Sequence, residues 1–483
     1  MNNIKTKKPD YYNIVAYLFF LFLIVWAVIT KEERILMSDP AFYFFNIVNQ
    51  VDFFYPGVRY TAIINQFPLV IATRMHLSLD SLLTVYSVSF VVVRLFYFFL
   101  ANNVFKNRAA GYAIIAISFV GVAESYFRPT SESTIALLNS ILLYAWLCYA
   151  DNKSNWGRLK SPISLFVTIL LIVFGYVTHP IALFSLFFVL VFFALEKYKL
   201  NTLYPYLAVF FLFAIFTFKV FIGKNGVDHN SLYGNLIQSP FSILAELKTY
   251  YPYRFFMHHF KWIYYPYAIL LGFALFASFK KHKWYVPAFL AAATFVYFVI
   301  ACTSFKEGDS NMQMEKIFLP MIMFAALVFA ASIQQFSYKN KMGLVTIAVV
   351  VVAMSMVINL KKYKPKYTKR ISDIRHEVVA LANNLENRKL VIKSEQIKQM
   401  PLGYCWAYGI ETLVISTIDK NTEPLTVFIF DDPESISDKM KQPDNFMPAR
   451  FQTSFRQSNF NKTYFNLPEQ EYIVWDEDFK SYH

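Results

Sequence analysis

Charged residues are scarce in this chain of 483 residues. Asp, Glu, Lys and Arg make up 16% of it, whereas about a quarter of an average soluble domain is charged. Hydrophobic residues reach 56%, and the chain holds 52 Phe and 33 Tyr. This composition excludes an ordinary soluble protein and predicts an integral membrane protein with many helical spans.

Glycine and cysteine are also rare. With only 13 glycines the chain has no glycine-rich phosphate-binding loop, so the sequence does not indicate a bound nucleotide. The cysteines Cys148, Cys302 and Cys405 are isolated from one another, and two of them fall in predicted spans. Isolated cysteines indicate neither a disulfide framework nor a metal cluster.

Hydrophobic runs predict about eleven transmembrane helices. The net charge of +14 does not point to nucleic acid as a partner, because Lys and Arg of membrane proteins collect in cytoplasmic loops. The first run follows a basic segment and has no small-residue cleavage site, so we expect an uncleaved first span. The expected spans are 14–30, 82–101, 110–124, 134–150, 162–177, 181–195, 204–222, 263–279, 285–302, 317–333 and 343–358.

The loops between these spans separate by charge, which predicts an orientation. Alternate loops carry mostly Lys and Arg, and the remaining loops carry most of the acids, which places the N-terminus in the cytoplasm. An odd number of spans then places the C-terminal segment outside. The basic stretch KKYKPKYTKR after the last span argues for the cytoplasm, but long exported domains largely ignore this rule. A twelfth span at 60–77 would invert every later loop.

The composition changes near residue 361, which predicts two domains. Residues 1–360 form the membrane domain, and residues 361–483 form a small soluble α/β domain. The segments KLVIK, LTVFIF and EYIVW have the pattern of short strands, and YCWAYGIETLVIST has the pattern of a helix between them. Strands that alternate with helices favour a small mixed sheet.

The first outer loop contains the stretch ILMSDPAFYFFNIVNQ, residues 35–50. A helix that starts at Asp39 has a polar stripe and apolar side chains on its other faces. This pattern predicts an interfacial helix on the outer membrane surface, and a second amphipathic stretch follows at about 59–77. The polar stripe consists of Asp39, Tyr43, Asn46 and Gln50, and the second stretch carries Arg59, Asn65, Gln66 and Pro68.

Asp39 has two interpretations. An Asp followed by Pro is a favoured helix start, in which the carboxylate accepts a hydrogen bond from the backbone as an N-cap. Ser38 is an alternative cap, and it would leave the carboxylate of Asp39 available for chemistry.

A few other polar residues lie close to predicted span ends on the acidic face. Glu124 and Arg128 either pair with each other or meet a ligand, and Glu132 is explained by a helix dipole. His179 lies in a very short turn, as a packed turn residue or as a donor to phosphate. Lys316, just before an apolar run, is the best basic candidate to point inward. No metal site is predicted.

These features together resemble the GT-C superfamily of polyprenyl-phosphate-dependent glycosyltransferases, which includes protein mannosyltransferases and lipid A aminoarabinose transferases. The resemblance covers about 360 residues and has a weaker extension in WAYGIETLVIST. Asp39 matches the acid that family members carry in the first outer loop. SYFRPTSES resembles their second outer loop, VTHPIAL their short histidine turn, and EKIFLPMIMFAALVFAA the start of a late span.

The resemblance implies transfer of a sugar from a lipid-linked donor to a glycan, lipid or protein acceptor, on the outer face of a bacterial plasma membrane. It implies Asp39 as catalytic base, with Glu124 as the alternative carboxylate. Many relatives carry an acidic pair where Pro40 follows Asp39 here, which weakens the case for a bound Mg²⁺ or Mn²⁺. Candidates for binding the donor phosphate are Arg128, His179 and Lys316, and further substrate-binding candidates are Tyr43, Asn46 and Arg59.

Two other functions stay open on the sequence. A transporter or flippase of lipid-linked glycans typically shows internal repeats or broken helices with buried charge. In this chain Arg94 is the main charge inside a predicted span, and no repeat is seen. A polysaccharide polymerase or ligase typically has a large Arg-rich outer loop, whereas the loop at 223–262 is only mildly basic.

Overall fold

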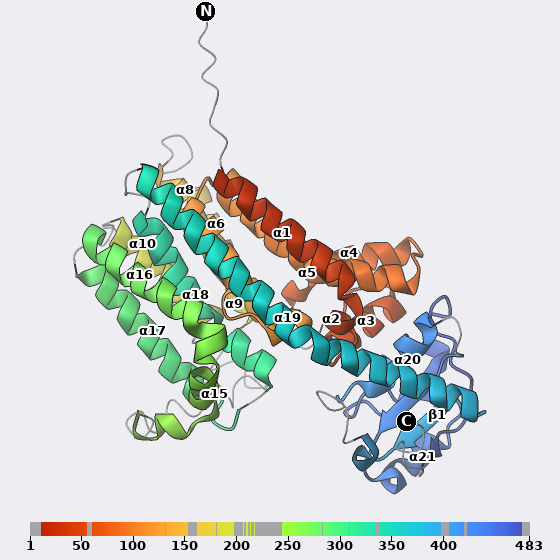
Figure 1. Ribbon diagram of the computed structural model, residues 1–483. Coiled ribbons are helices and arrows are strands. Elements are labelled where there is room, and N and C mark those ends of the chain that lie inside the picture. Colours follow the sequence, from red (N-terminus) through yellow and green to blue (C-terminus); the bar gives the residue numbers. More distant parts are fainter. Residues whose placement is uncertain are drawn as a thin grey trace, which may run out of the picture.

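The computed structural model consists of a bundle of long helices with an α/β unit at one end (Figure 1). It describes residues 11–55, 60–130, 132–152, 162–179, 181–197, 244–282, 284–308, 310–333, 338–397, 405–419 and 423–475, with single residues between 206 and 217.

Long apolar helices make up the bundle. Six helical stretches in the described part of the chain are long and apolar enough to cross a membrane, so the protein is a helical membrane protein, as its composition predicts. The count of eleven spans stays a prediction, and span 204–222 lies almost wholly outside the described residues. The six stretches are Tyr12–Ile29, Leu79–Val104, Glu132–Asp151, Tyr251–Lys281, Tyr285–Ser304 and Asn311–Ile333.

The helices of the bundle follow the predicted order. Helix α18 lies at the centre of the bundle, because every residue of its apolar stretch, 314–333, is buried. Its ring of Phe324 stacks on Phe188 of α10, with 3.9 Å between the ring centroids. The bundle helices are α1 (Tyr11–Ile29), α5 (Leu79–Phe99), α6 (Arg108–Phe119), α8 (Glu132–Asn152), α9 (Pro162–Thr178), α10 (Ala182–Glu196), α16 (Tyr265–His282), α17 (Tyr285–Ser304) and α18 (Asn311–Ile333).

Shorter helices connect the bundle at the end where the α/β unit lies. The π-helical turn η4 (Phe260–Tyr264) joins α15 to α16 in one continuous stretch. These shorter helices are α2 (Lys31–Ile35), α3 (Asp39–Gln50), α4 (Ile63–Arg74), α7 (Glu124–Phe127) and α15 (Tyr251–His259).

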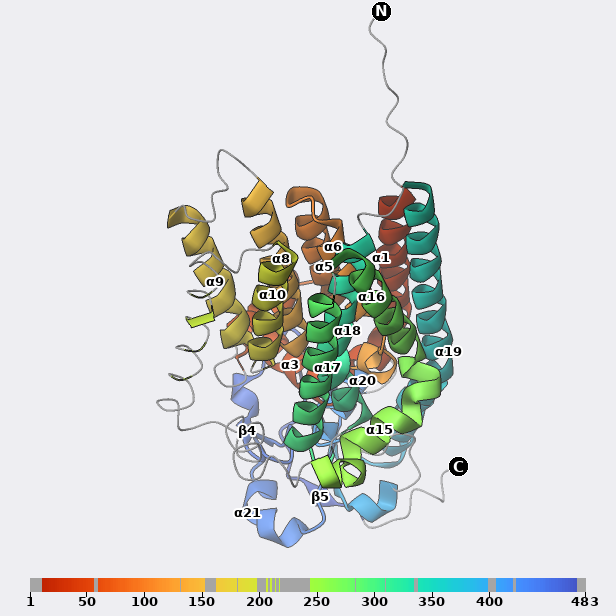
Figure 2. The same ribbon diagram turned by 90° about the vertical axis from the view of Figure 1, so that its left-hand side faces the viewer.

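Helix α19 (Tyr338–Asn384) crosses the predicted domain boundary at 360–361 without a break. Its 47 residues extend over about 70 Å at 1.5 Å per residue, more than twice the roughly 30 Å of a bilayer core. It runs beside α1, and both helices end at the side of the α/β unit (Figures 1 and 2). The start of α1 and the α/β unit lie at opposite ends of the bundle (Figure 1).

The α/β unit contains the strands and the helix that the sequence predicts. Strands β1 (Lys389–Ile392), β2 (Thr426–Ile429) and β5 (Ile473–Val474) form a sheet in the order β2-β1-β5. The prediction of a mixed sheet is wrong, because β1 pairs in parallel with both neighbours. Helix α20 (Tyr408–Ile418) lies between β1 and β2 in the chain and provides the crossover that parallel strands need. A separate antiparallel pair comprises β3 (Asn445–Phe446) and β4 (Phe455–Arg456).

Helix α3 packs against the α/β unit, which corrects its predicted place on the membrane surface. The residues from Pro40 to Asn49 are all buried. The ring of Phe45 lies 5.1 Å from that of Phe465 and 5.5 Å from that of Phe446, measured between centroids. The apolar side of α3 is therefore covered by protein and not by lipid. Helix α4 does keep an exposed apolar side chain, Phe67, at 54%.

Candidate functional site

The candidate site lies where the first turns of α3, α8 and α18 meet. Lys316 of α18 is buried, as an inward-pointing side chain should be, and its Nζ donates to the carbonyl of Thr130 at 2.8 Å. A buried ammonium group needs opposite charge nearby. The charged groups that act on it are Asp39, Glu132, Arg128 and Arg94.

Asp39 is the first helical residue of α3 and is half-buried. Ser38 occupies the N-cap position, and its side chain makes no capping hydrogen bond. Asp39 therefore lies inside the first turn, not at the cap. Its charge acts on Lys316 and on Tyr86 of α5, which places its carboxylate on the side of the bundle.

Tyr43 and Glu132 connect α3 to the start of α8. The hydroxyl of Tyr43 donates to Oε1 of Glu132 at 3.2 Å, and both side chains are buried. The sequence explains Glu132 by the helix dipole alone and misses this contact. Asn46, one turn after Tyr43, donates from Nδ2 to the carbonyl of Phe42 at 2.8 Å, so its amide nitrogen is bound within α3.

Glu315, the residue before Lys316, is a second group that the sequence does not single out. Its carboxylate accepts from the backbone N–H groups of Ala123 and Glu124 at 2.9 Å and of Ser125 at 2.8 Å. The hydroxyl of Ser125 adds a fourth bond at 2.6 Å. Glu315 and Lys316 thus hold the segment 123–130 at both its ends, through its first N–H groups and its last carbonyl.

Glu124 and Arg128 lie in this held segment but do not pair with each other in the described structure. Oε1 of Glu124 accepts from Nδ2 of Asn311 at 3.1 Å, and Glu124 acts electrostatically on Tyr363 and Tyr367 of α19. The Nε–H of Arg128 is buried and has no hydrogen-bond partner among the described residues.

A small cavity of about 30 Å³ opens beside Lys316. His179 also lines it, and Nδ1 of His179 accepts from the backbone N–H of Ile181 at 3.2 Å, as a packed turn residue does. The lining is amphiphilic, which is typical of sites for small ligands. Its polar residues are Ser133, His179, Ser304, Gln313 and Lys316, and its apolar residues are Ile181, Phe184, Tyr297, Ile300, Ala301, Phe305 and Ile317.

A second and smaller cavity, of about 10 Å³, also lies near the start of α8. Arg94 of α5 and Thr134 of α8 line it, together with Asn65 of α4. Ser133 in the first cavity and Thr134 in the second belong to the first turn of α8, and a helix N-terminus favours negative charge. Lys316 lines the first cavity and Arg94 lines the second.

The structure does not test the predictions for Arg59 or for a divalent cation. Arg59 lies outside the described residues. No group of three or more His, Cys, Asp or Glu side chains that could hold a metal ion occurs in the described part of the chain. The expectation of an Mg²⁺ or Mn²⁺ ion therefore stays untested.

Comparisons of the chain with protein-family models, with curated proteins and with solved structures found no match. The resemblance to GT-C glycosyltransferases thus rests only on the sequence motifs and stays a prediction.

Proposed function

We propose that this protein is a membrane glycosyltransferase that moves a sugar from a polyprenyl-phosphate donor to an acceptor. The observation that carries the proposal is the grouping of Asp39, Lys316 and Arg128 at one end of the bundle, beside an amphiphilic cavity. A carboxylate and two cations are the groups that such a transfer needs.

The donor fits this surrounding by its chemistry. Its phosphate carries negative charge, which Lys316 and Arg128 attract, and its lipid chain is apolar, as is most of the cavity lining. His179 lies on the same lining, and because its Nδ1 accepts from Ile181, its ring donates through the Nε2–H, which suits a phosphate oxygen. Tyr43 holds Glu132 beside these groups, which keeps a second carboxylate near the cations.

The reaction is a substitution at the anomeric carbon of the sugar. The bond from this carbon to the phosphate oxygen breaks, and a bond to the acceptor oxygen or nitrogen forms. The acceptor proton passes to the carboxylate of Asp39, and polyprenyl phosphate leaves with its negative charge against Lys316 and Arg128. Glu124 is the less suitable base, because Asn311 already donates to its carboxylate.

The proposed setting is a bacterial plasma membrane crossed about eleven times, with the N-terminus inside. The α/β unit and the candidate site then lie outside the cytoplasm, where lipid-linked sugars are used. A divalent cation is not required by this scheme, and nucleic acid has no part in it.

Buried Arg94 supports a second candidate function. It lies within the bundle and lines the smaller cavity, and a buried charge at such depth is typical of transporters. The runner-up is therefore a transporter or flippase of lipid-linked glycans, while a polymerase or ligase would use the same donors as the main proposal.

The experiment that tests the proposal follows the mass of the donor. The full-length protein in lipid nanodiscs is given polyprenyl-phosphate sugars together with envelope extracts as a source of acceptor. A transferase releases sugar-free polyprenyl phosphate and produces a glycosylated acceptor, both detected by mass spectrometry. A flippase instead moves the intact donor across vesicles without any change of mass. If no donor is either consumed or moved across the vesicle membrane, both proposals are contradicted.

A further inference from the structure

The backbone of Ser38, the residue before Asp39, has an unusual conformation. Its φ is 58° and its ψ is −131°, a combination that residues with a side chain rarely adopt. Such a conformation persists only where the surrounding structure holds it, and it is often found next to functional groups. The direction in which α3 and Asp39 leave this point depends on Ser38 remaining in this conformation.

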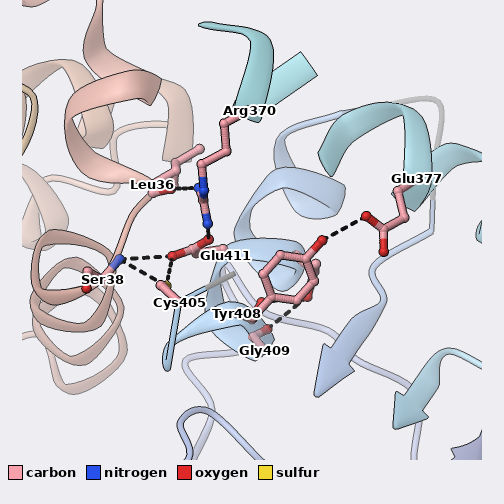
Figure 3. A network of polar contacts seen from close by, with 9 residues as sticks. Leu36, Ser38, Arg370, Glu377, Cys405, Tyr408, Gly409 and Glu411 are labelled. Atoms are coloured by element: carbon pink, nitrogen blue, oxygen red, sulfur yellow. Dashed lines mark hydrogen bonds and ion pairs between the residues drawn. The ribbon is translucent and has the colours of Figure 1, made fainter. Parts of the chain in front are cut away.

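Glu411 of α20 holds Ser38 in place (Figure 3). The N–H of Ser38 donates to Oε1 of Glu411 at 2.9 Å, and the Sγ of Cys405 lies 3.3 Å from the same nitrogen. Figure 3 shows the two segments meeting at this carboxylate, although they are more than 360 residues apart in the sequence.

Arg370 of α19 completes the contact from the other side. Its Nη2 donates to Oε2 of Glu411, and its Nη1 donates to the carbonyl of Leu36 at 3.2 Å (Figure 3). Glu411 is 0% and Arg370 1% exposed. Burial by itself lowers the pKa of Arg370, but the Glu411 carboxylate outweighs burial and raises that pKa, so the pair stays charged.

We infer that the α/β unit positions the candidate base, with Glu411 as the positioning residue. Glu411 uses both of its oxygens: one binds Ser38 at the start of α3, and the other binds Arg370 of α19. Arg370 also holds Leu36, so the segment 36–38 is fixed from two directions. The consequence for catalysis rests on the proposed function, whereas the hold on Ser38 does not.

The variant Glu411→Gln tests this inference with little change in shape. Glutamine has one acceptor oxygen, while Ser38 and Arg370 are donors on opposite sides of residue 411. The guanidinium attracts that oxygen, so the NH₂ group is left facing the N–H of Ser38. We expect hydrogen exchange in the segment 36–42 to become about ten- to a hundredfold faster, as for the loss of a charged hydrogen bond, measured by mass spectrometry in nanodiscs.

Glu377→Gln is the matched control. Glu377 lies on α19 in the same unit and accepts from the hydroxyl of Tyr408 at 2.8 Å, but none of its described bonds reaches Ser38 (Figure 3). The control should leave exchange in 36–42 unchanged. Unchanged exchange in a folded Glu411→Gln protein would overturn the inference.

A rescue variant keeps the test meaningful where Glu411→Gln folds poorly. Glycine adopts a positive φ without a steric penalty, so Ser38→Gly in the Glu411→Gln background should restore much of the protection of α3. Ser38→Gly could also increase the protection of α3 by the same amount in the Glu377→Gln background. The gain would then not depend on the loss of Glu411, and the inference would be contradicted.

Sugar transfer gives the functional readout. Glu411→Gln should lower kcat for the transfer while KM for the donor changes little, because the phosphate-binding candidates lie on α18 and in segment 123–130. Faster exchange with normal kcat would overturn the positioning role. If the wild-type protein transfers no sugar, the proposed function is refuted. Faster exchange in Glu411→Gln would then still support the contact between Glu411 and Ser38.

Discussion

Two buried polar clusters lie on either side of Asp39, and they differ in how completely their groups are paired. In the cluster of Arg370, Glu411 and Ser38, both carboxylate oxygens of Glu411 and the N–H of Ser38 bind other protein groups (Figure 3). In the cluster around Lys316, the Nε–H of Arg128 and the hydroxyl of Ser304 have no hydrogen-bond partner in the described residues. Buried polar groups are nearly always paired.

The difference assigns a different role to each cluster. A cluster whose bonds all stay inside the protein fixes one conformation, and its loss is felt as lost stability or lost position. A cluster with unpaired donors beside a cavity has capacity left for a ligand. We therefore expect substitutions in the paired cluster to act on folding, and substitutions in the unpaired cluster to act on substrate.

The largest expected effect is at Asp39. Asparagine keeps the size and the hydrogen-bonding capacity of the side chain but cannot accept a proton. Asp39→Asn should lower the transfer rate by roughly two to four orders of magnitude, measured as release of polyprenyl phosphate at matched protein levels. Near-normal transfer would remove Asp39 as the base.

Asp52→Asn provides the control for Asp39→Asn. Asp52 lies just after α3 in the same loop, is well exposed and stands 4.0 Å from Arg74. A surface ion pair of this kind contributes little, so transfer by this variant should equal that of the wild type.

Breaking the paired cluster should give the largest loss of stability. Arg370→Met leaves the buried carboxylate of Glu411 without its partner, which typically costs about 3–5 kcal/mol. The thermal midpoint, followed by tryptophan fluorescence in detergent, should fall clearly. The double variant Arg370→Met with Glu411→Leu should recover part of the loss, because no unpaired charge then remains.

Arg375→Met is the matched control on the same helix. Arg375 pairs with Glu32 at 2.9 Å, but its side chain is 37% exposed. Its loss should cost at most about 1 kcal/mol. An equal loss in both arginine variants would contradict the distinction between the buried pair and the surface pair.

The unpaired cluster should respond in substrate binding with little loss of stability. In Arg128→Gln the Nε–H that is lost has no described partner, so the thermal midpoint should change little. The KM for the lipid-linked donor should rise about tenfold or more, as for the loss of one charged contact to phosphate. Arg254→Gln, at an exposed position of α15, should leave KM unchanged. A lower midpoint without a change in KM would place Arg128 among the structural groups.

The smallest expected effect is a pH dependence within the α/β unit. Burial raises the pKa of Glu377 from 4.5 to about 7, and the hydrogen bond from Tyr408 opposes this shift. Folding therefore favours the protonated carboxyl, and this contribution is complete below about pH 4.5 and is lost as the pH rises through about 7. Glu377→Gln should flatten the decline of the thermal midpoint between about pH 4.5 and 7.

Hydropathy was sufficient to predict the helices of the bundle and the short strands of the α/β unit. It was not sufficient for α3, because an amphipathic pattern shows which side is apolar but not whether lipid or protein covers it. The continuity of α19 was also missed. A change in composition near residue 361 suggested a boundary there, yet Lys is a good helix former, and the helix continues through Lys361 and Lys362.

The sequence predicted only those residues of the candidate site whose chemical type is unusual at the end of an apolar span. Asp39 and Lys316 were found because charges at span ends are rare. Glu315 was missed because its partners lie about 190 residues earlier in the chain, and no local pattern indicates such a contact. The hold of Glu411 on Ser38 was missed for the same reason, with a separation of 373 residues.

Because α19 is unbroken, we expect the thickness of the bilayer to affect the candidate site. A helix whose apolar part does not match the surrounding lipid adjusts by tilting, and in the predicted topology, where the last span lies in α19, that tilt continues into the α/β unit. Because Arg370 belongs to this helix while Ser38 belongs to the loop after α1, a change of tilt acts as a lever on the contact between them. We therefore expect the chain length of the surrounding lipid to change the position of Asp39, although Asp39 itself does not belong to α19.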